Sequence, residues 1–558
     1  MRAPLGSLRR RHAVVALVLY VAAALVFQRH AVAHIGSTCA CWGTDASQFM
    51  WAMTWWPHAL VSGMNPFVTH VMWVPDQVNL ASATTTPGPA LFAAPLTALA
   101  GPVVSYNVLM VLAPITGAWF AYRLCLYLTR APAASILGGY LFGFSTYGLG
   151  QLEGHLQLVF TFAAPAAALL TLKRLDGVIG ARRYLVLMAI VLVAQLLCGT
   201  EMLLTLTCMG VVALAAGWLF SAAQTRPRII ALLAPLAGAY AVLVVLCAPF
   251  LYYALTGPNV IGGTATLYPA DALSFVIPPV IILAGGHRFA AVSGSFAGNF
   301  AENGTYLGIP LVLVVAAFAI KRWRTGAGKI LLSVLAVAVA WALGETLHID
   351  GHATIPLPWR AFAGLPLLHE VLPVRIGVYI ALVSAVMAAL WLATPGSRLL
   401  RWLLAAVAVA FLIPNANAVA PTTGANLFNE SFDVPTFFST NLYRRYLRPG
   451  EIVLPIPLGM TGPSLVWQAR TDMYFRLASG GFELPADYAS NPFVEQALGS
   501  RPVAAPEAAL RSFIRERRVS AVVVEANMAG AWPGVLARLG LRVLDTGGVL
   551  LYRIHARY

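Results

Sequence analysis

Apolar runs of about 20 residues recur along the chain as far as residue 418. A helix of that length crosses the roughly 30 Å hydrocarbon core of a bilayer. Such runs predict an α-helical polytopic membrane protein with about eleven transmembrane helices, in a range of ten to thirteen. We place the spans at residues 12–28, 103–128, 133–148, 156–172, 184–200, 202–221, 229–253, 305–320, 330–347, 376–394 and 402–418.

A change in charge density near residue 419 divides the chain. In residues 12–418, 28 of 407 positions are charged, whereas 25 of the 140 positions in 419–558 are charged. Overall 59% of residues are apolar, against about 45–50% in soluble proteins, which excludes a soluble enzyme, a disordered chain and a disulfide scaffold. We expect a membrane region at 1–418, with a large first extracytoplasmic loop at 29–102, and a small soluble α/β domain at 419–558.

The basic residues predict the orientation. With the N-terminus inside, eighteen Lys and Arg fall on inner segments, and four fall on outer ones. Inner loops of membrane proteins carry this excess, so the net charge of +15 does not indicate a nucleic-acid partner. An odd number of spans then places the C-terminal domain outside. We expect a multi-pass protein of the cytoplasmic (inner) membrane with a cytoplasmic N-terminus and an extracytoplasmic C-terminal domain.

The C-terminal domain has the pattern of a small α/β fold. β-Branched runs at 451–458, 521–526 and 549–555 predict strands, and the apolar spacing of 506–519 predicts an amphipathic helix. Its charged residues resemble a solvated surface, so we assign it no catalysis.

An aromatic helix is predicted early in the first outer loop. Phe49, Met53 and Trp56 have helical spacing, and tryptophan favours the headgroup region of a bilayer, so we expect this helix to lie at the outer interface. Thr44 or Asp45 would cap its N-terminus. Asp45 has a second interpretation, a general base held at the membrane surface, and the two roles are compatible.

A second polar cluster lies between two apolar spans, in "GFSTYGLGQLEGHLQLVF" at 143–160. Glu153 and His155 are two positions apart and cannot share a helical face, so the segment is predicted to be a turn. The pair could bind a metal ion or carry a proton. Alternatively, His155 caps the next span.

Two later outer segments add candidates for substrate contacts. Glu302 and Tyr306 come just before a span, and Arg360 and Arg375 lie in a proline-rich loop. An arginine kept outside against the charge bias suits a bidentate contact with phosphate. The alternatives are pairing with lipid headgroups or a salt bridge to Glu370.

The sequence contains no motif for a bound cofactor. A phosphate-binding loop, GxGxxG after a strand, HExxH and GxSxG are all absent. Cys39 and Cys41 are separated by one residue, tighter than metal-ligand spacing, and we expect two unpaired cysteines, with a local disulfide as the alternative. No cofactor is predicted. A divalent metal ion is possible but nothing in the sequence supports it.

Several segments together resemble the GT-C glycosyltransferases, and more narrowly a bacterial family of glycosyltransferase-like membrane proteins. They are "GTDASQFMWAMTWWPHALVSGMNPF", "SYN" at 105–107, "EGHLQL", "ENGTYLG" and "IPLPWRAFAGLPLLHEVLPVRIG". The resemblance covers most of residues 1–418 and, loosely, the soluble C-terminal part. It implies transfer of a sugar from a polyprenyl-phosphate donor to a glycan, lipid or protein acceptor of the cell envelope on the outer face.

The resemblance also implies roles for individual residues. Asp45 would be the general base, Arg375 and Arg360 would hold the donor phosphate, and Glu153 with His155 would bind sugar hydroxyls or assist the base. Many GT-C proteins have two adjacent acids in the first loop, whereas Ala46 follows Asp45 here, so a metal requirement is not supported. The competing interpretations are a transporter or flippase of a lipid-linked saccharide, and a non-catalytic scaffold for envelope assembly with the same fold.

Overall fold

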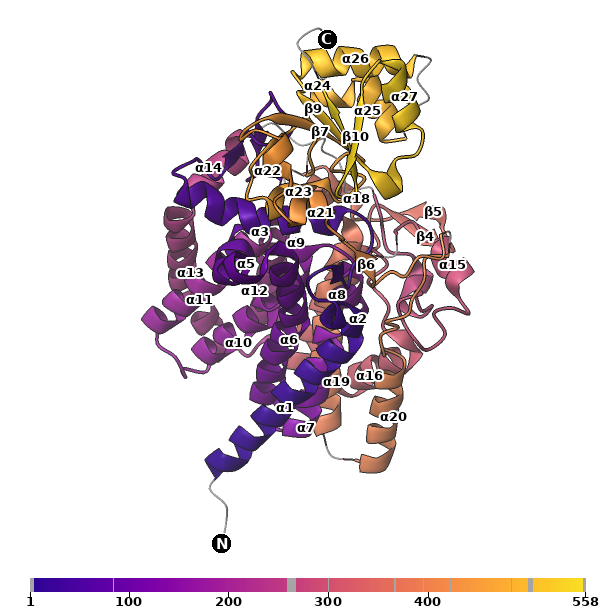
Figure 1. Ribbon diagram of the computed structural model, residues 1–558. Helices are drawn as coiled ribbons and strands as arrows, with labels where there is room; N and C mark the ends of the chain where they lie inside the picture. The colour runs from indigo at the N-terminus through magenta and orange to yellow at the C-terminus, as the bar shows by residue number, and fades with distance from the viewer. Residues whose placement is uncertain are drawn as a thin grey trace. The chain divides into compact units, whose positions relative to one another are not determined.

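The computed structural model describes residues 5–83, 85–257, 267–299, 301–365, 368–394, 396–421, 423–482, 484–499 and 505–554 (Figure 1). The chain divides into two compact units, which we describe separately. We call residues 1–29, 110–248 and 261–428 the helical unit, and residues 30–109, 249–260 and 429–558 the mixed unit. The first outer loop therefore shares a unit with most of the predicted C-terminal domain.

A helix lies at each of the eleven predicted spans. They are α1 (Leu5–Phe27), α6 (Pro102–Thr129), α7 (Pro132–Gly143), α10 (Ala163–Leu175), α11 (Ala181–Cys198), α12 (Thr200–Phe220), α13 (Arg226–Leu246), α16 (Gly308–Arg322), α17 (Gly326–Ala342), α19 (Gly377–Ala393) and α20 (Arg398–Ala410).

Six helical stretches in the described part of the chain are long and apolar enough to cross a membrane: 102–129, 156–175, 181–198, 200–220, 223–246 and 373–393. Two further apolar helices, 11–27 and 326–342, are shorter. The protein is thus a multi-pass membrane protein. The count of eleven spans stays a prediction, because α7, α16 and α20 have only 12, 15 and 13 residues.

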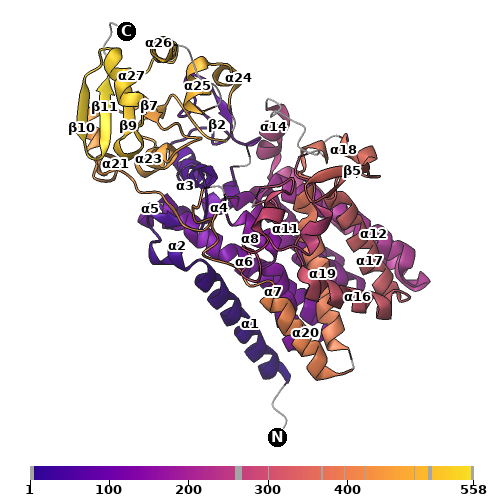
Figure 2. The ribbon, with the colours of Figure 1, turned by 90° about the vertical axis from the view of Figure 1, so that its right-hand side faces the viewer.

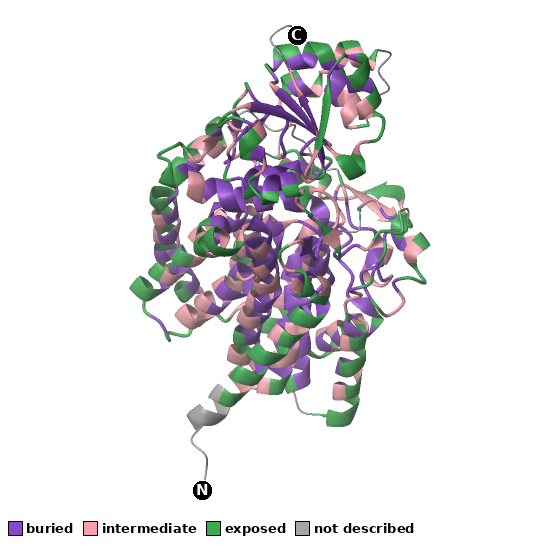
Figure 3. Cartoon of the chain, viewed as in Figure 1, coloured by how far each residue is buried: buried purple, intermediate pink, exposed green. Residues whose placement is uncertain are grey.

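Helix α19 forms the centre of the helical unit. It packs against α7, α16 and α17, and 89% of its apolar stretch is buried by protein, against 17% for α12 (Figure 3). An apolar helix that is covered by protein on all sides is a core helix. Helix α12 instead leaves most of its apolar surface for lipid.

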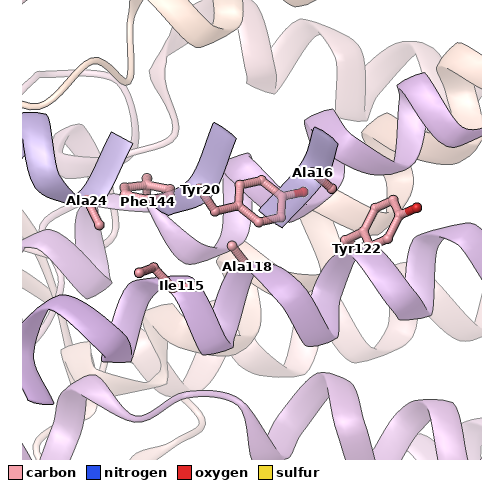
Figure 4. Packing of buried hydrophobic residues seen from close by; sticks show 7 residues of the cluster. All are labelled: Ala16, Tyr20, Ala24, Ile115, Ala118, Tyr122 and Phe144. Atoms are coloured by element: carbon pink, nitrogen blue, oxygen red, sulfur yellow. The ribbon is translucent and has the colours of Figure 1, made fainter. Parts of the chain in front are cut away.

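The first helix is held to the helical unit by small side chains and tyrosine. Ala16, Tyr20 and Ala24 of α1 meet Ala118 of α6 in a fully buried cluster (Figure 4). The Tyr20 hydroxyl donates a hydrogen bond to the carbonyl oxygen of Ile136 at 2.8 Å, which satisfies its polar atom inside the packed helices.

The mixed unit contains a five-stranded sheet in the order β10-β11-β9-β7-β8 (Figure 2). The predicted strands are confirmed as β7 (Ile452–Ile456), β9 (Ala521–Glu525) and β11 (Val549–Arg553); position 555 lies outside the described residues. The predicted helix is α26 (Pro506–Glu516). Strand β7 runs parallel to β9 and to β8 (Arg476–Leu477), whereas β11 runs antiparallel to β9 and to β10 (Val543–Thr546).

The aromatic helix of the first loop exists as α3 (Asp45–Val61), but its tryptophans are covered by protein and not by lipid headgroups. Its place at the bilayer surface stays a prediction. Trp51, Trp55 and Trp56 are each at most 2% exposed. The Trp51 indole donates a hydrogen bond to Gln468 Oε1 at 2.7 Å, and α3 packs against α23 (Ser464–Arg470). These side chains belong to the core of the mixed unit and not to a headgroup layer.

The start of the first loop is also tied to the chain's C-terminal part. Strand β1 (Thr38–Cys39) pairs with β6 (Glu430–Ser431). Cys39 and Cys41 form a disulfide, so our preference for two unpaired cysteines was wrong.

Candidate functional site

The segment 143–160, which was predicted to be a turn, is a turn only at residues 152–154. Helix α8 (Thr146–Gln151) precedes this turn in the helical unit, and a second short helix follows it. Two glycines allow α8 to approach the segment at 301–304. A Cβ on Gly150 would come within 2.4 Å of the Ala301 carbonyl oxygen, and one on Gly304 within 2.9 Å of Tyr147 Cα. Any side chain at either position would separate the two segments.

Gln151 joins the turn to this segment. Its Nε2 donates to the Ala301 carbonyl oxygen at 3.0 Å and to Glu302 Oε2 at 3.3 Å, while its Oε1 lies 2.7 Å from His155 Nδ1. The carboxylate of Glu302 and the imidazole of His155 are therefore held by the same buried amide.

Arg375 lies on the turn Pro373–Ile376 that leads into α19. It occupies the centre of a polar cluster that consists of Gln151, Glu153, His155, Glu201, Glu302 and Arg375. Its Nε and Nη2 donate to Glu302 Oε1 at 3.0 and 2.5 Å, and its Nη1 donates to Glu201 Oε2 at 2.5 Å. The side chains of Arg375, Glu201 and Glu302 are 16%, 19% and 2% exposed. Arg375 and the two carboxylates therefore form a buried network of charge-assisted hydrogen bonds. The guanidinium is already paired with anionic groups and is not a vacant site for another anion.

This network bears on one interpretation of Arg375, the salt bridge to Glu370. The partner expected for a salt bridge was Glu370, but Glu370 lies 2.7 Å from the imidazole of His369. The ion pairs of Arg375 are with Glu201 and Glu302 instead. The contact with a donor phosphate stays a prediction, and in this structure three nitrogens of the guanidinium already donate to carboxylates.

Glu153 is the acid of the cluster whose carboxylate is least balanced by hydrogen bonds and positive charge. It is 4% exposed, and its Oε1 has no hydrogen-bond partner within the described residues. Burial raises the pKa of Glu153 well above its ordinary value, and the negative charge of Glu302 raises it further. Burial also acts to raise the pKa of Glu302, but the charge and hydrogen bonds of Arg375 outweigh burial and lower it.

These opposite shifts predict opposite pH effects on stability. The folded protein holds the Glu153 proton more tightly than the unfolded chain, so this contribution is full below about pH 4.5 and is lost as the pH rises, by up to about 1.4 kcal/mol per pH unit. The contribution of Glu302 is present above that pH and is lost as the pH falls below it. We expect Glu153→Gln to flatten the loss of stability between pH 5 and pH 8.

Thermal unfolding in detergent across that range measures the slope. Glu516→Gln is the matched control because it makes the same change at an exposed carboxylate, and it should retain the wild-type slope. An unchanged slope in Glu153→Gln would mean that Glu153 is ionised in the folded protein.

The other predicted site residues have different surroundings. His155 is the residue before α9 (Leu156–Val159), yet its side chain makes no capping hydrogen bond. Tyr306 is 2% exposed, and its carbonyl oxygen accepts a hydrogen bond from Thr146 at 3.1 Å, so it contributes to the packing around the cluster. Arg360 is exposed on α18 (Arg360–Ala363).

Asp45 belongs to the mixed unit, where it is the first residue of α3 and is exposed. Thr44 occupies the capping position, but its hydroxyl donates to the Met460 carbonyl oxygen at 2.8 Å and makes no cap. Gln48 Nε2 donates to Asp45 Oδ1 at 3.3 Å. A carboxylate in the first turn is also stabilised by the helix dipole, so Asp45 is ordered and accessible.

Metal ligands do not gather anywhere in the described ranges, which contain no group of three or more His, Cys, Asp or Glu side chains suited to one ion. In the cluster, the carboxylates of Glu201 and Glu302 are already paired with a guanidinium. These residues do not fit a divalent metal site, and we derive no step that uses one.

Two members of the cluster were not among the predicted site residues. Glu201, in the first turn of α12, is an acid beside a short turn between two apolar helices, where ionisable groups usually have a function. Gln151 stood in the same polar turn as Glu153. Both signals were visible in the sequence, but the pairing of Glu201 with a residue 174 positions away was not.

The fold formed by these helices and the sheet is that of the GT-C membrane glycosyltransferases. Its structural neighbours are proteins of that class over nearly the whole chain. Neither a protein-family model nor a curated protein matches the sequence.

One such neighbour is the arabinofuranosyltransferase AftD from Mycobacteria, with a TM-score of 0.59 and 15% identity over 98% of this chain. This chain spans only 42% of AftD. Another is the archaeal oligosaccharyltransferase AglB from Archaeoglobus fulgidus, solved with an inhibitory peptide and a dolichol-phosphate. It has a TM-score of 0.52 and 13% identity, over 98% of this chain and 75% of AglB. At these identities the likeness concerns the fold.

Proposed function

We propose that this protein is a membrane glycosyltransferase that moves a sugar from a polyprenyl-phosphate donor to an acceptor of the cell envelope. The observation that carries the proposal is an accessible carboxylate, Asp45, fixed at the start of a buried helix in the first loop of a GT-C fold. The lipid class of the donor is supported by AglB, which was solved with a dolichol-phosphate. The acceptor is a glycan, a lipid or a protein.

In the proposed reaction Asp45 removes the proton from the acceptor hydroxyl as its oxygen attacks the anomeric carbon. The bond from that carbon to the donor phosphate breaks, and polyprenyl phosphate leaves. A base must lie within hydrogen-bond reach of the proton it takes. The packing of Trp51 and Trp55 on the same helix fixes the backbone from which Asp45 projects.

The cluster around Arg375 has a different proposed role. Glu153 Oε1 and Glu201 Oε1 are buried oxygens for which the described residues supply no hydrogen bond, and sugar hydroxyls are suitable donors for them. His155 completes this set of sugar contacts. Arg360, which is exposed, is the better candidate for the donor phosphate, since Arg375 is engaged by two carboxylates.

Profiling of envelope glycans and lipid-linked sugars tests the function. We expect cells that lack the protein to lose one envelope glycan and to accumulate the matching lipid-linked sugar. Accumulation of that sugar on the inner face alone would favour a flippase. Loss of the glycan in the deletion strain but not in an Asp45→Asn strain would favour a scaffold.

A reporter fused after the last residue tests the orientation. The excess of basic residues on one set of segments, together with an odd number of spans, predicts that the C-terminus is outside. The proposed chemistry likewise needs Asp45 outside. An extracytoplasmic reporter fused there should therefore be active, and a cytoplasmic one should be silent. The opposite pattern would overturn the odd number of spans together with the outer location of Asp45.

A further inference from the structure

A crevice of about 380 Å³ runs between the helices of the helical unit, with walls from α6, α10, α11, α12, α13, α17 and α19. An apolar cavity of about 150 Å³ already stays dry and holds a benzene molecule. The crevice is thus large enough for a chain of methylene groups.

The few polar side chains of the wall each have a hydroxyl partner. The hydroxyls of Thr207 and Tyr240 lie 2.7 Å apart, and those of Thr171 and Tyr184 lie 3.3 Å apart. Tyr379 also lines the crevice, and its hydroxyl lies 3.0 Å from that of Thr205. The remaining lining consists of Leu, Ala, Val, Ile and Met with two glycines. Such a wall offers water no partners and favours a hydrocarbon chain.

Positive charge is concentrated at one end of these helices. Fourteen Lys and Arg lie in the segments 121–131, 172–184, 220–230, 320–330 and 394–402, which contain one acid, Asp176. That acid accepts a hydrogen bond from the Tyr127 hydroxyl at 2.6 Å. Lys173 lies close enough to Arg123 and Arg183 for their like charges to act on it. An anion would relieve this repulsion.

Two of these arginines have donors that the described protein atoms do not use. Nε of Arg174, in the last turn of α10, and Nε of Arg226, in the first turn of α13, are buried without a hydrogen-bond acceptor. Arg174 is within electrostatic reach of the hydroxyl of Tyr184, whose side chain lines the crevice. Ile229, one turn after Arg226, lines it as well.

We propose that this crevice binds an anionic phospholipid, with one acyl chain between the helices and the phosphate at Arg174 and Arg226. A basic pocket between transmembrane helices recognises such headgroups, and arginine pairs well with phosphate. The proposed base and the proposed sugar-contacting residues are not among the side chains that line this crevice. It binds a lipid of the membrane that holds the protein, and it does not depend on the proposed reaction.

The test uses the purified full-length protein in detergent. Phosphatidylglycerol, phosphatidylcholine and undecaprenyl phosphate are added separately, and the bound lipid is counted by native mass spectrometry. We expect retention of one phosphatidylglycerol in preference to phosphatidylcholine. Arg174→Gln should weaken it about tenfold, the effect of losing one hydrogen bond to a charged group.

A second variant tests the crevice without changing any charge. Gly210 lines it, and a Cβ there would meet no atom within 4 Å, so Gly210→Leu should fill the space and displace the acyl chain. Arg398→Gln is the control, because Arg398 is an exposed arginine on α20, a helix that does not line the crevice. It should retain phosphatidylglycerol as the wild type does.

Three results would overturn the proposal. Equal retention of phosphatidylcholine would remove the role of the headgroup charge. Loss of binding in Arg398→Gln as large as in Arg174→Gln would mean a diffuse surface attraction. Retention of undecaprenyl phosphate but not of phosphatidylglycerol would assign the crevice to a polyprenyl chain.

Discussion

Replacement of Arg375 by alanine is expected to lower the stability of the folded protein by about 3–5 kcal/mol, the usual cost of removing one partner from a buried ion pair. The change would leave Glu302, which is 2% exposed, and Glu201 as neighbouring carboxylates without their cation. Thermal unfolding in detergent and the yield of folded protein measure the effect.

Two further variants identify the cause of that loss. Arg360→Ala removes an exposed arginine and should change stability by no more than about 0.5 kcal/mol. Combining Arg375→Gln with Glu201→Gln and Glu302→Gln removes all three charges, and it should recover much of the lost stability because no unpaired charge remains buried. Wild-type stability of Arg375→Ala together with a selective loss of donor binding would instead support the phosphate contact.

The second large effect is expected at Asp45. Asp45→Asn retains the shape of the side chain but cannot accept a proton, so the transfer rate should fall about 100- to 10,000-fold, as expected for loss of a general base. Stability should change by at most about 1 kcal/mol, the value of a carboxylate at a helix N-terminus. The rate is measured in membranes of the producing organism, which contain its own lipid-linked sugars.

The matched control for this experiment is Asp545→Asn, the same change at an exposed aspartate of strand β10. It should leave both the rate and the stability unchanged. A fall in stability without a fall in rate at position 45 would mean that Asp45 serves only the helix end. A rate that falls equally in both variants would mean that the loss is not specific to the proposed base.

Local patterns predicted the helices and strands well. Apolar length sets the positions of the membrane helices, and β-branched runs set β7, β9 and β11, because both depend on residues close together in the sequence. Strand β10, at Val543–Thr546, was missed. It is a four-residue strand with a mostly exposed pattern, so the alternation that marks a half-buried strand is absent.

The candidate site was predicted only as a set of separate polar turns. Glu153 was identified because ionisable residues beside apolar spans are uncommon. Glu302 was identified because it comes just before a span, and Arg375 because it lies outside against the charge bias. Their partners depend on which turns meet in space, and the 73 positions between Glu302 and Arg375 contain no local signal for that.

The tryptophans of α3 illustrate a second limit. An aromatic helix that lies in a headgroup layer and one that packs against a protein domain have similar sequences. Only the hydrogen bond from Trp51 to Gln468 and the burial of the neighbouring rings distinguish the two.

The mixed unit combines segments from both ends of the chain, so its parts are synthesised at different times. Trp51 and Gln468 are 417 positions apart, so at about 5–20 residues per second the ribosome needs roughly 20–80 s to proceed from one to the other. During that time α3 has been made, but the segment that contacts Trp51 has not. The Trp51 ring must therefore wait for these partners until the end of the chain is synthesised, and a nascent chain halted before residue 429 would expose it to chaperones and proteases.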